Sequence, residues 1–523
     1  MKKITIILLL ICGFTYSQSL TVQNGASLTI EKTGTATVGG NFSNSGTVTM
    51  NSDADEFSAI KVSGSTSGNI VYNRYVNAVG TNEWDLIGSP VDGLSISLFA
   101  STNDSPLATA GGSGGNQYAI GQFDNSQSSV VDAWTNFTTA NIGTSGDFSL
   151  GQGYQMGTDS GATLAFTGTI SSSDVTRSII DNSASGYRWN LVANPYPSYL
   201  YLNTAADDTN NLITVNTSVG NQNIDGSFAA VYGWNPNKTG GAGYESFDGN
   251  DTAKYIAPGQ GFFIAASSSS SIDLDFTEAM QTVIGGDDFV LGDTPIEFNE
   301  IYLNIYNEDL LMGQTHLRFR EEMSLGLDPS YDVGSFFQDD PITTRLVDND
   351  SGVNLEHQNL PTSVMENAVI PLVINQSAGQ EFRINLFTAT IPDPNVYLED
   401  VEEGTFTNLY EGDFVYTPTS DLSGVGRFFI HMNADTMSNE DVSTSMLNAY
   451  KEVNANYITI EGLATQSNNT NVSLYNILGR KVLDTSLNNN MNTQTISTLG
   501  MAAGIYVIEL ESGTDRLTKK LII

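Results

Sequence analysis

The sequence predicts an all-β protein built from several units, and three observations support this fold class. Short runs rich in Val, Ile, Thr, Tyr and Phe recur along the chain between clusters of Gly, Asn and Ser, as expected for strands and turns. Charged residues make up only 15% of the chain, against the usual ~25%, so Ser, Thr, Asn and Gly must supply much of the polar surface. The 523 residues are enough for about three to four units of roughly 150 residues.

The first 17 residues have the pattern of a secretory signal peptide. A basic start and an apolar run over residues 4–14 precede a small-x-small cleavage site that ends at Ser17. A lipoprotein signal would need a small residue before Cys12, where Ile11 stands, so plain cleavage is favoured. Because Cys12 is the one cysteine, we expect a mature chain without disulfides, thiolate nucleophiles or cysteine metal ligands.

The charge balance excludes several classes of partner. The chain has 20 basic and 58 acidic residues, and its formal net charge is −38. Phosphate backbones and anionic membranes would be repelled, which argues against a nucleic-acid-binding protein. After the signal peptide, no apolar run approaches the ~18 residues of a membrane helix, so no transmembrane segment is expected in the mature chain.

Residues 18–68 predict a small stack of very short strands with Gly and Asn at the corners. Strands of this length cannot bury a face alone, so a β-solenoid-like segment is the expected solution. A meander packed on the next unit is the alternative. The expected strands are 20–22, 27–30, 36–38, 46–50 and 60–62.

Residues 69–281 contain an internal duplication. The matching segments are Trp84 to Pro90 with Trp189 to Pro195, Gly151 to Tyr154 with Gly259 to Phe262, and Phe123 and Trp134 with Trp234 and Tyr244. We therefore expect two copies of one β unit, at residues 69–170 and 171–281. The alternation of their aromatic residues with Leu and Ile favours packing in a core, and a sugar-stacking surface is the alternative. The loops at residues 103–116 and 235–251 are the most open to ligands.

Residues 282–435 follow a Ser-rich bridge and contain the acidic Asp287-Asp288 near their start. Their six strand-like runs predict a β-sandwich, with residues 326–332 (GLDPSYD) as its most distinctive loop. A polar linker is expected at residues 436–446.

Residues 447–523 predict a small C-terminal Ig-like β-sandwich. A hairpin is expected around Gly479, because glycine takes the positive φ of a tight loop, with Arg480 and Lys481 opening its second strand. A further strand follows Gly504 and carries Tyr506. The final run contains Lys519 and Lys520 and ends in apolar residues, so we expect a core strand at the terminus.

This last stretch resembles the C-terminal sorting domain (type A-like) of the type IX secretion system. The matching features are YNILGRKVL, the spacing from Leu499 to Leu510 and the closing Lys519-Lys520-Leu-Ile-Ile. The sequence departs from the family at residues 447–451, where many members have Pro-Asn-Pro. An ordinary terminal Ig-like module is the alternative. The resemblance implies a secreted or cell-surface protein on the outer face of the outer membrane. Its implied partners are the outer-membrane secretion and sorting machinery, with removal of the domain and release or attachment to lipopolysaccharide.

The sequence contains no constellation that we identify as catalytic. His316, His357 and His431 form no ligand pair by spacing, and structural roles are expected for them. Residues 111–115 match G-x-S-x-G, but a Gly/Ser loop surrounds them where a nucleophile elbow needs a strand and then a helix. Pairs such as Asp339-Asp340 are uninformative in so acidic a chain.

Calcium is the one cofactor with support from spacing. Three acidic loops offer hard oxygen ligands: residues 51–55, 248–251 and 348–350. None of them completes an EF-hand, and solvated turn residues explain them equally well.

These observations together predict an exported, non-catalytic, adhesin-like or structural surface protein. A glycan-binding protein that contributes to polysaccharide capture is the alternative. A third hypothesis, a hydrolase of unrecognised type, requires two carboxylates facing each other across a cleft at ~5 to 9 Å.

Overall fold

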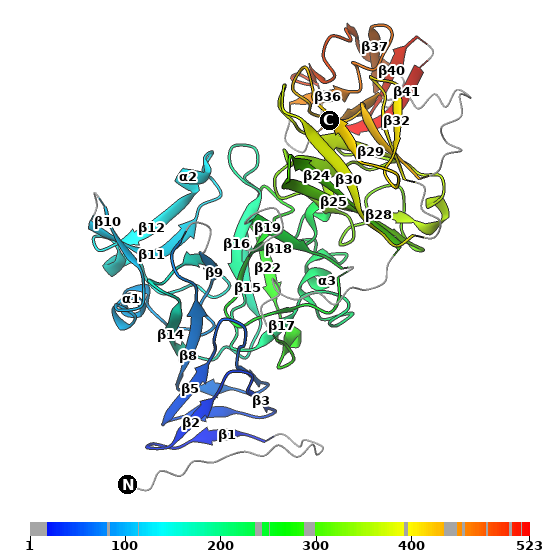
Figure 1. Cartoon of the computed structure of the whole chain (residues 1–523). Coiled ribbons are helices and arrows are strands. Elements are labelled where there is room, and N and C mark those ends of the chain that lie inside the picture. Colours follow the sequence, from blue (N-terminus) through cyan, green and yellow to red (C-terminus); the bar gives the residue numbers. More distant parts are fainter. Residues whose placement is uncertain are drawn as a thin grey trace.

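A computed structural model describes residues 18–80, 84–112, 115–235, 243–249, 251–286, 299–391, 396–432, 447–451, 456–476, 480–501, 505–513 and 515–523. The expected signal peptide, the linker at 436–446, Asp287-Asp288, Gly479 and Gly504 lie outside these ranges. Within them, no helix is both long and apolar enough to cross a membrane. Strands dominate throughout (Figure 1), which confirms the all-β class.

The N-terminal strands stack in parallel, so that successive rungs lie on one another. Three parallel sheets form the walls of this stack. The first contains β1 (Leu20–Val22), β4 (Phe42–Asn44) and β7 (Thr66–Ser67), and the second contains β2 (Ser27–Ile30), β5 (Thr47–Asn51) and β8 (Asn69–Val76). The third contains β3 (Thr35–Val38) and β6 (Ala59–Val62). Parallel partners such as Ile30 with Met50 and Val38 with Val62 point inward and are buried. This pairing is that of stacked solenoid rungs, because a meander would pair neighbouring strands antiparallel.

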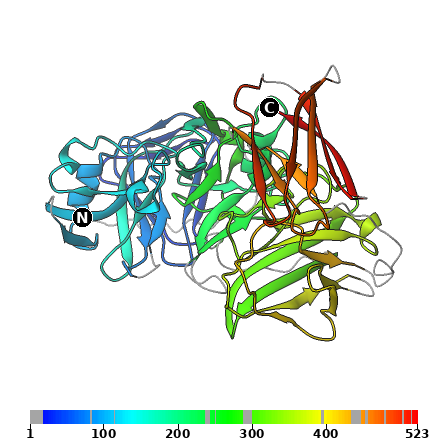
Figure 2. The same cartoon turned by 90° about the horizontal axis from the view of Figure 1, so that it is seen from above.

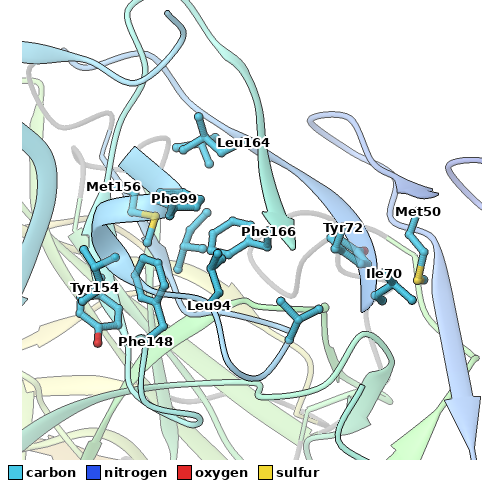
Figure 3. Packing of buried hydrophobic residues seen from close by; sticks show 14 of the residues in the cluster. Met50, Ile70, Tyr72, Leu94, Phe99, Phe148, Tyr154, Met156, Leu164 and Phe166 are labelled. Atoms are coloured by element: carbon cyan, nitrogen blue, oxygen red, sulfur yellow. The ribbon is translucent and has the colours of Figure 1, made fainter. Parts of the chain in front are cut away.

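The solenoid shares its core with the first β unit. Strand β8 pairs antiparallel with β14 (Ala162–Thr169), and one apolar cluster runs from Val22 to Ile170. Figure 3 shows Met50 and Tyr72 at one end of this cluster and Phe99, Phe148 and Tyr154 at the other. The boundary expected after residue 68 therefore lies inside one packed body.

The first unit contains a five-stranded sheet and two short helices. Its remaining elements are β9 (Asp85–Ile87), α1 (Ile96–Thr102), β10 (Thr109–Gly112), β11 (Gly115–Phe123), α2 (Val130–Ala133), β12 (Trp134–Thr138), η1 (Ile142–Thr144) and β13 (Tyr154–Met156). Helix α1 begins after Ser95, whose side chain accepts a hydrogen bond from the Leu98 N–H. Strands β10 and β11 form a hairpin on either side of residues 113–114. A strand therefore follows Ser113, where a nucleophile elbow requires a helix.

The second unit has three sheets around its own core. Its elements are β15 (Val175–Ile179), β16 (Trp189–Ala193), β17 (Tyr199–Tyr201), α3 (Leu212–Thr217), η2 (Gly226–Phe228), β18 (Val231–Asn235), β19 (Gly243–Phe247), β20 (Tyr255–Ile256), β21 (Gly261–Ala265), β22 (Ile272–Phe276), η3 (Glu278–Met280) and β23 (Gln281–Thr282). Helix α3 begins after Asn211, whose side chain accepts the Thr214 N–H.

The strands between residues 299 and 431 form one continuous 11-stranded sheet, where the sequence predicted a two-sheet sandwich. We call it the curled sheet. Phe414 in β33, an end strand, lies 5.9 Å from Phe428 in β34 near the opposite end, and both halves line a single core. Its elements are β24 (Asn299–Asn307), β25 (Leu310–Arg320), β26 (Val333–Gly334), β27 (Ile342–Thr344), β28 (Leu355–Pro361), η4 (Thr362–Val364), β29 (Val369–Ile374), β30 (Phe382–Ala389), β31 (Tyr397–Asp400), β32 (Thr405–Asn408), β33 (Phe414–Tyr416) and β34 (Phe428–His431).

The C-terminal region is a two-sheet sandwich with its own core. One sheet contains β35 (Asn448–Tyr450), β36 (Tyr457–Glu461) and β39 (Gln494–Ser497); the other contains β38 (Lys481–Leu487), β37 (Thr470–Asn476), β40 (Ile505–Ser512) and β41 (Asp515–Ile522). The β37–β38 pair confirms the predicted hairpin. Figures 1 and 2 show this sandwich against the curled sheet, at the end of the molecule away from the solenoid.

Candidate functional site

Four strands of the five-stranded sheet in the first β unit have the same order and register as the four-stranded sheet of the second β unit. The first sheet runs β12-β11-β13-β9 and the second runs β19-β18-β21-β16. Tyr154 pairs with Ile87 in the first, and Phe262 pairs with Val192 in the second. These four residues occupy the matching positions of the duplicated sequence, so equal positions in the two segments make equal strand contacts.

The two sheets also contact each other reciprocally through their Gly-Gln-Gly turns. The Gly88 N–H donates to the Gly259 carbonyl at 2.9 Å, and the Ala193 N–H donates to the Gly151 carbonyl at 3.0 Å. Gly151 and Gly259 have φ of 75° and 68°, values that favour glycine. A side chain at Gly88 would place its Cβ 2.4 Å from that of Ala193. Each sheet therefore supports the turn of the other at very close approach.

Aromatic side chains gather where these sheets meet the curled sheet. Two cross-strand pairs, Phe123 with Trp134 and Trp234 with Tyr244, converge on Phe263, with centroid distances of 4.9 Å from Phe123 and 5.3 Å from Tyr244. Phe336 packs against the second pair. We call the following set the aromatic junction: Phe123, Trp134, Tyr187, Trp189, Tyr232, Trp234, Tyr244, Phe263 and Phe336.

The aromatic junction is neither fully buried, as a core would be, nor fully exposed, as a sugar-stacking surface would be. Trp189 is only 6% exposed, and Phe336 stacks on it at 4.3 Å with an interplanar angle of 13°. Phe336 also stacks on Tyr244 at 4.0 Å. Trp84, Trp134 and Trp234 are half-buried. The junction therefore holds the units together while leaving ring surface accessible to solvent.

A buried ion cluster joins the second unit to the curled sheet. Arg318 of β25 contacts Asp248 at 3.1 Å and Asp251 at 3.6 Å, and His357 Nδ1 lies 2.8 Å from the same Asp248 carboxylate. Burial alone would lower the pKa of Arg318, but the two carboxylates outweigh it and raise that pKa. Burial, followed by repulsion from Asp248, raises the pKa of Asp251.

Asp332 is a third buried carboxylate at the same interface. It belongs to the GLDPSYD loop and accepts the backbone N–H groups of Asn359 and Asp328, both at 2.7 Å. Burial nevertheless raises its pKa to about 7. The loop contacts the second unit through the Gly249 N–H, which donates to the Ser330 carbonyl at 2.8 Å. This distinctive loop is therefore part of an interface between units.

The three histidines lie in strands, as predicted for His316 and His431. His316 and His357 are partners in the parallel β25–β28 pair, and their rings stack at 4.7 Å. His431 Nε2 lies 2.6 Å from Glu399. The stacked pair of histidines could not be predicted from the sequence, because it depends on which strands are neighbours.

The acidic loops considered for calcium each contact a cationic side chain of the protein. Asp53 pairs with Lys32, Asp248 with Arg318, and Asp350 with Arg345. Within the described ranges, no group of three or more His, Cys, Asp or Glu side chains is placed to hold a metal ion.

The residues predicted from the sorting motif are spread over the C-terminal sandwich. Lys481 is exposed and lies 3.3 Å from Asp484, and the Arg480 N–H donates to Asn476 Oδ1 at 3.1 Å. Tyr506 is buried in the core. Lys520 pairs with Val507 through the backbone.

Comparison with known proteins assigns most of the chain to two families. The family described as a domain of unknown function, DUF8693, matches residues 9–432. The chain belongs to this family. The secretion system C-terminal sorting domain matches residues 454–523, so the chain is an exported surface protein of the type IX secretion system. No curated protein matches the chain.

Nine solved chains match the protein. One of them is a biofilm associated protein, BSP domain, with 11% identity over 86% of this chain and 90% of that chain. Its TM-score is 0.16.

The sorting domain contacts the DUF8693 region through a second buried arginine. Arg345 of the curled sheet binds Asp350 at 2.8 Å and Glu461 of the sorting domain at 3.3 Å. The Tyr450 hydroxyl donates to the other oxygen of Glu461 at 2.8 Å. Burial alone would lower the pKa of Arg345, but the neighbouring carboxylates outweigh it and raise that pKa. Burial raises the pKa of Glu461.

Lys519 of the sorting motif completes this contact. Its ammonium group donates to the Asp350 carbonyl at 2.6 Å and to Asn448 Oδ1 at 2.9 Å. Burial lowers the pKa of Lys519. We call the set Arg345, Asp350, Asn448, Tyr450, Glu461 and Lys519 the polar dock. It holds the sorting domain against the DUF8693 region through charged and hydrogen-bonded groups.

Proposed function

We propose that this protein is a non-catalytic, adhesin-like surface protein, delivered by its sorting domain. The observation that carries the proposal is the separate construction of the two parts. The sorting domain has its own apolar core, whereas the aromatic junction unites both β units with the curled sheet. A delivered body needs to be rigid, and a sorting tag needs to be separable.

The buried carboxylates support a structural role for the body. Asp248 and Asp251 face Arg318, and Asp332 accepts two backbone N–H groups. Groups held in this way serve the packing of units. We further propose recognition by the outer-membrane machinery, removal of the sorting domain, and release or attachment to lipopolysaccharide on the outer face.

Deletion of residues 447–523 tests the delivery step. In a bacterium with a type IX secretion system, the full chain should reach the surface or medium, and the truncated chain should stay in the periplasm. Fractionation and protease treatment of whole cells measure this. Export of the truncated chain would contradict the assignment. Purified residues 18–432 should bind whole cells or matrix without hydrolysing polysaccharides or peptides, and turnover of either substrate would contradict the non-catalytic part.

Glycan binding is the second candidate, and the half-buried tryptophans favour it. Trp84, Trp134 and Trp234 are only partly buried, and tryptophan rings stack on the apolar faces of sugars. A glycan array probed with the purified mature chain tests this function. Binding to no glycan on the array would remove it.

A further inference from the structure

The two matching sheets differ in what covers their outer faces, meaning the faces turned away from the cores of their units. On the second sheet, Tyr232 pairs with Phe263 across β18 and β21, and both side chains are buried. Phe336 of the curled sheet covers this face and lies between Trp189 and Tyr244, at 4.3 and 4.0 Å. The outer face of the second sheet is thus covered by an aromatic ring.

On the first sheet, the equivalent central pair is Gly121 with Gln155. Two aromatic rings of the second sheet are therefore replaced by a hydrogen and an amide. A Cβ at Gly121 would lie 2.6 Å from Gln155 Nε2 and 2.7 Å from Asn136 Oδ1. Glycine at this position thus leaves room for the two amides beside the strand.

The two amides form an ordered polar surface. Gln155 Nε2 donates to Asn136 Oδ1 at 3.0 Å, and Asn136 Nδ2 donates to the Tyr118 carbonyl at 2.9 Å. These bonds use one N–H of each amide and one amide oxygen. A primary amide has two N–H donors and an oxygen acceptor, so within the described ranges Gln155 Oε1 and the second N–H of each residue remain for a ligand.

Tryptophans stand at both sides of this amide pair. Trp134 in β12 occupies the position of Tyr244, and Trp84, directly before β9, occupies the position of Trp189. Both tryptophans are half-buried, and Trp84 also packs against the core of the first unit. The ring contacts of Trp134 are with Phe123 and Phe263, at the side of the aromatic junction. The first outer face therefore repeats the aromatic borders of the second around a polar centre.

We propose that the outer face of the first sheet binds one sugar ring of a neutral glycan, in the place that the Phe336 ring takes on the second sheet. Trp84 and Trp134 contact the apolar C–H surface of the sugar, and the Gln155 and Asn136 amides hydrogen-bond its hydroxyls. A sugar has both kinds of surface, whereas a phenyl ring would leave the amides unsatisfied. The net charge of −38 disfavours polyanionic glycans. This inference rests on the glycan-binding candidate above.

Titration of the mature chain, residues 18–523, with neutral hexasaccharides of glucose, mannose and N-acetylglucosamine tests the site. Calorimetry should detect binding of at least one hexasaccharide. Trp134→Ala should weaken it roughly tenfold, as loss of one stacked ring implies, and Gln155→Phe should abolish it by recreating the second sheet. Gln155→Ala serves if the larger side chain disturbs folding, and it should weaken binding several-fold. Tyr410→Ala, at an exposed aromatic position between β32 and β33, is the control and should bind as the parent chain does.

The possible results distinguish failure of the proposed site on the first sheet from failure of the glycan-binding function. If no hexasaccharide binds, both the glycan-binding candidate and this site are wrong. If one binds and the first-sheet variants bind it as well as the parent chain, glycan binding stands and the site assignment fails. Trp234→Ala probes the second sheet in the same titration, and loss of binding in this variant alone would place the ligand there and overturn the assignment.

Discussion

The curled sheet meets its two neighbours through buried arginines, yet the two interfaces are built differently. Arg318 binds Asp248 and Asp251 of the second unit, and Arg345 binds Glu461 of the sorting domain. Around the first, the aromatic junction continues across the interface. Around the second, the cores of the curled sheet and the sorting domain are separate clusters. Because an apolar core continues across only the first interface, we expect the body to stay together and the sorting domain to separate more easily.

The largest effect is expected from Arg318→Ala. Removing this guanidinium takes the arginine cation away from the buried Asp248 and Asp251 carboxylates, which costs about 3–5 kcal/mol. The aromatic junction prevents the interface from opening to solvate them, so the whole body should unfold at a lower temperature. Thermal denaturation measures this. Arg383→Ala, which removes an exposed pair with Asp413, is the control and should change stability little. Equal effects of the two variants would contradict the comparison.

The body interface should also respond to pH through Asp332. Its folded pKa of about 7 lies above the ordinary value near 3.9, so its contribution is fully present below about pH 4. That contribution is lost as pH rises toward 7, by about 2 kcal/mol between pH 5 and pH 7. Asp332→Asn should flatten this slope. Denaturant unfolding of both proteins across this range measures the difference, and an unchanged slope would contradict the assignment.

Arg345→Ala should release the sorting domain without unfolding the body. Glu461 and Asp350 lose their cation at a cost of about 1–3 kcal/mol, and separation of the domain lets water solvate them. Calorimetry of the mature chain should show a lower transition for the sorting domain and an unchanged one for the body. Arg516→Ala is the matched control, because its ion pairs with Glu509 and Glu511 are exposed. A shift of both transitions would indicate that the polar dock stabilises the body as much as the interface around Arg318 does, and it would contradict the comparison.

The smallest effect is expected from Lys519→Met. This change removes two hydrogen bonds of the polar dock and keeps most of the apolar stem, so about 1 kcal/mol or less of docking free energy should be lost. Faster hydrogen exchange across the docked face measures the change. Lys481→Met, at an exposed position paired with Asp484, should leave exchange there unaltered.

Much of the fold could be predicted because strand signals are local. The C-terminal hairpin, the parallel rungs and the duplicated units follow from alternation, glycine positions and repeated segments. The continuous curled sheet could not be predicted, since alternation assigns faces to strands but does not choose their neighbours. Of the candidate site, Trp84, Trp134 and Trp234 were identified from the sequence. The amide pair at Gln155 and Asn136 was missed, because Gly121 marks it only once the register is known.

The sequence by itself determined the all-β class, the C-terminal sorting domain and the equivalence of the repeated segments, because each of these depends on short, local sequence patterns. Only the tertiary structure decided that Phe336 covers one of two equivalent sheets and leaves the other with an amide centre. It also decided that two buried arginines, Arg318 and Arg345, lie at interfaces with different apolar surroundings. Both outcomes depend on which distant segments exclude water together, and the strength of an ion pair is set by that burial.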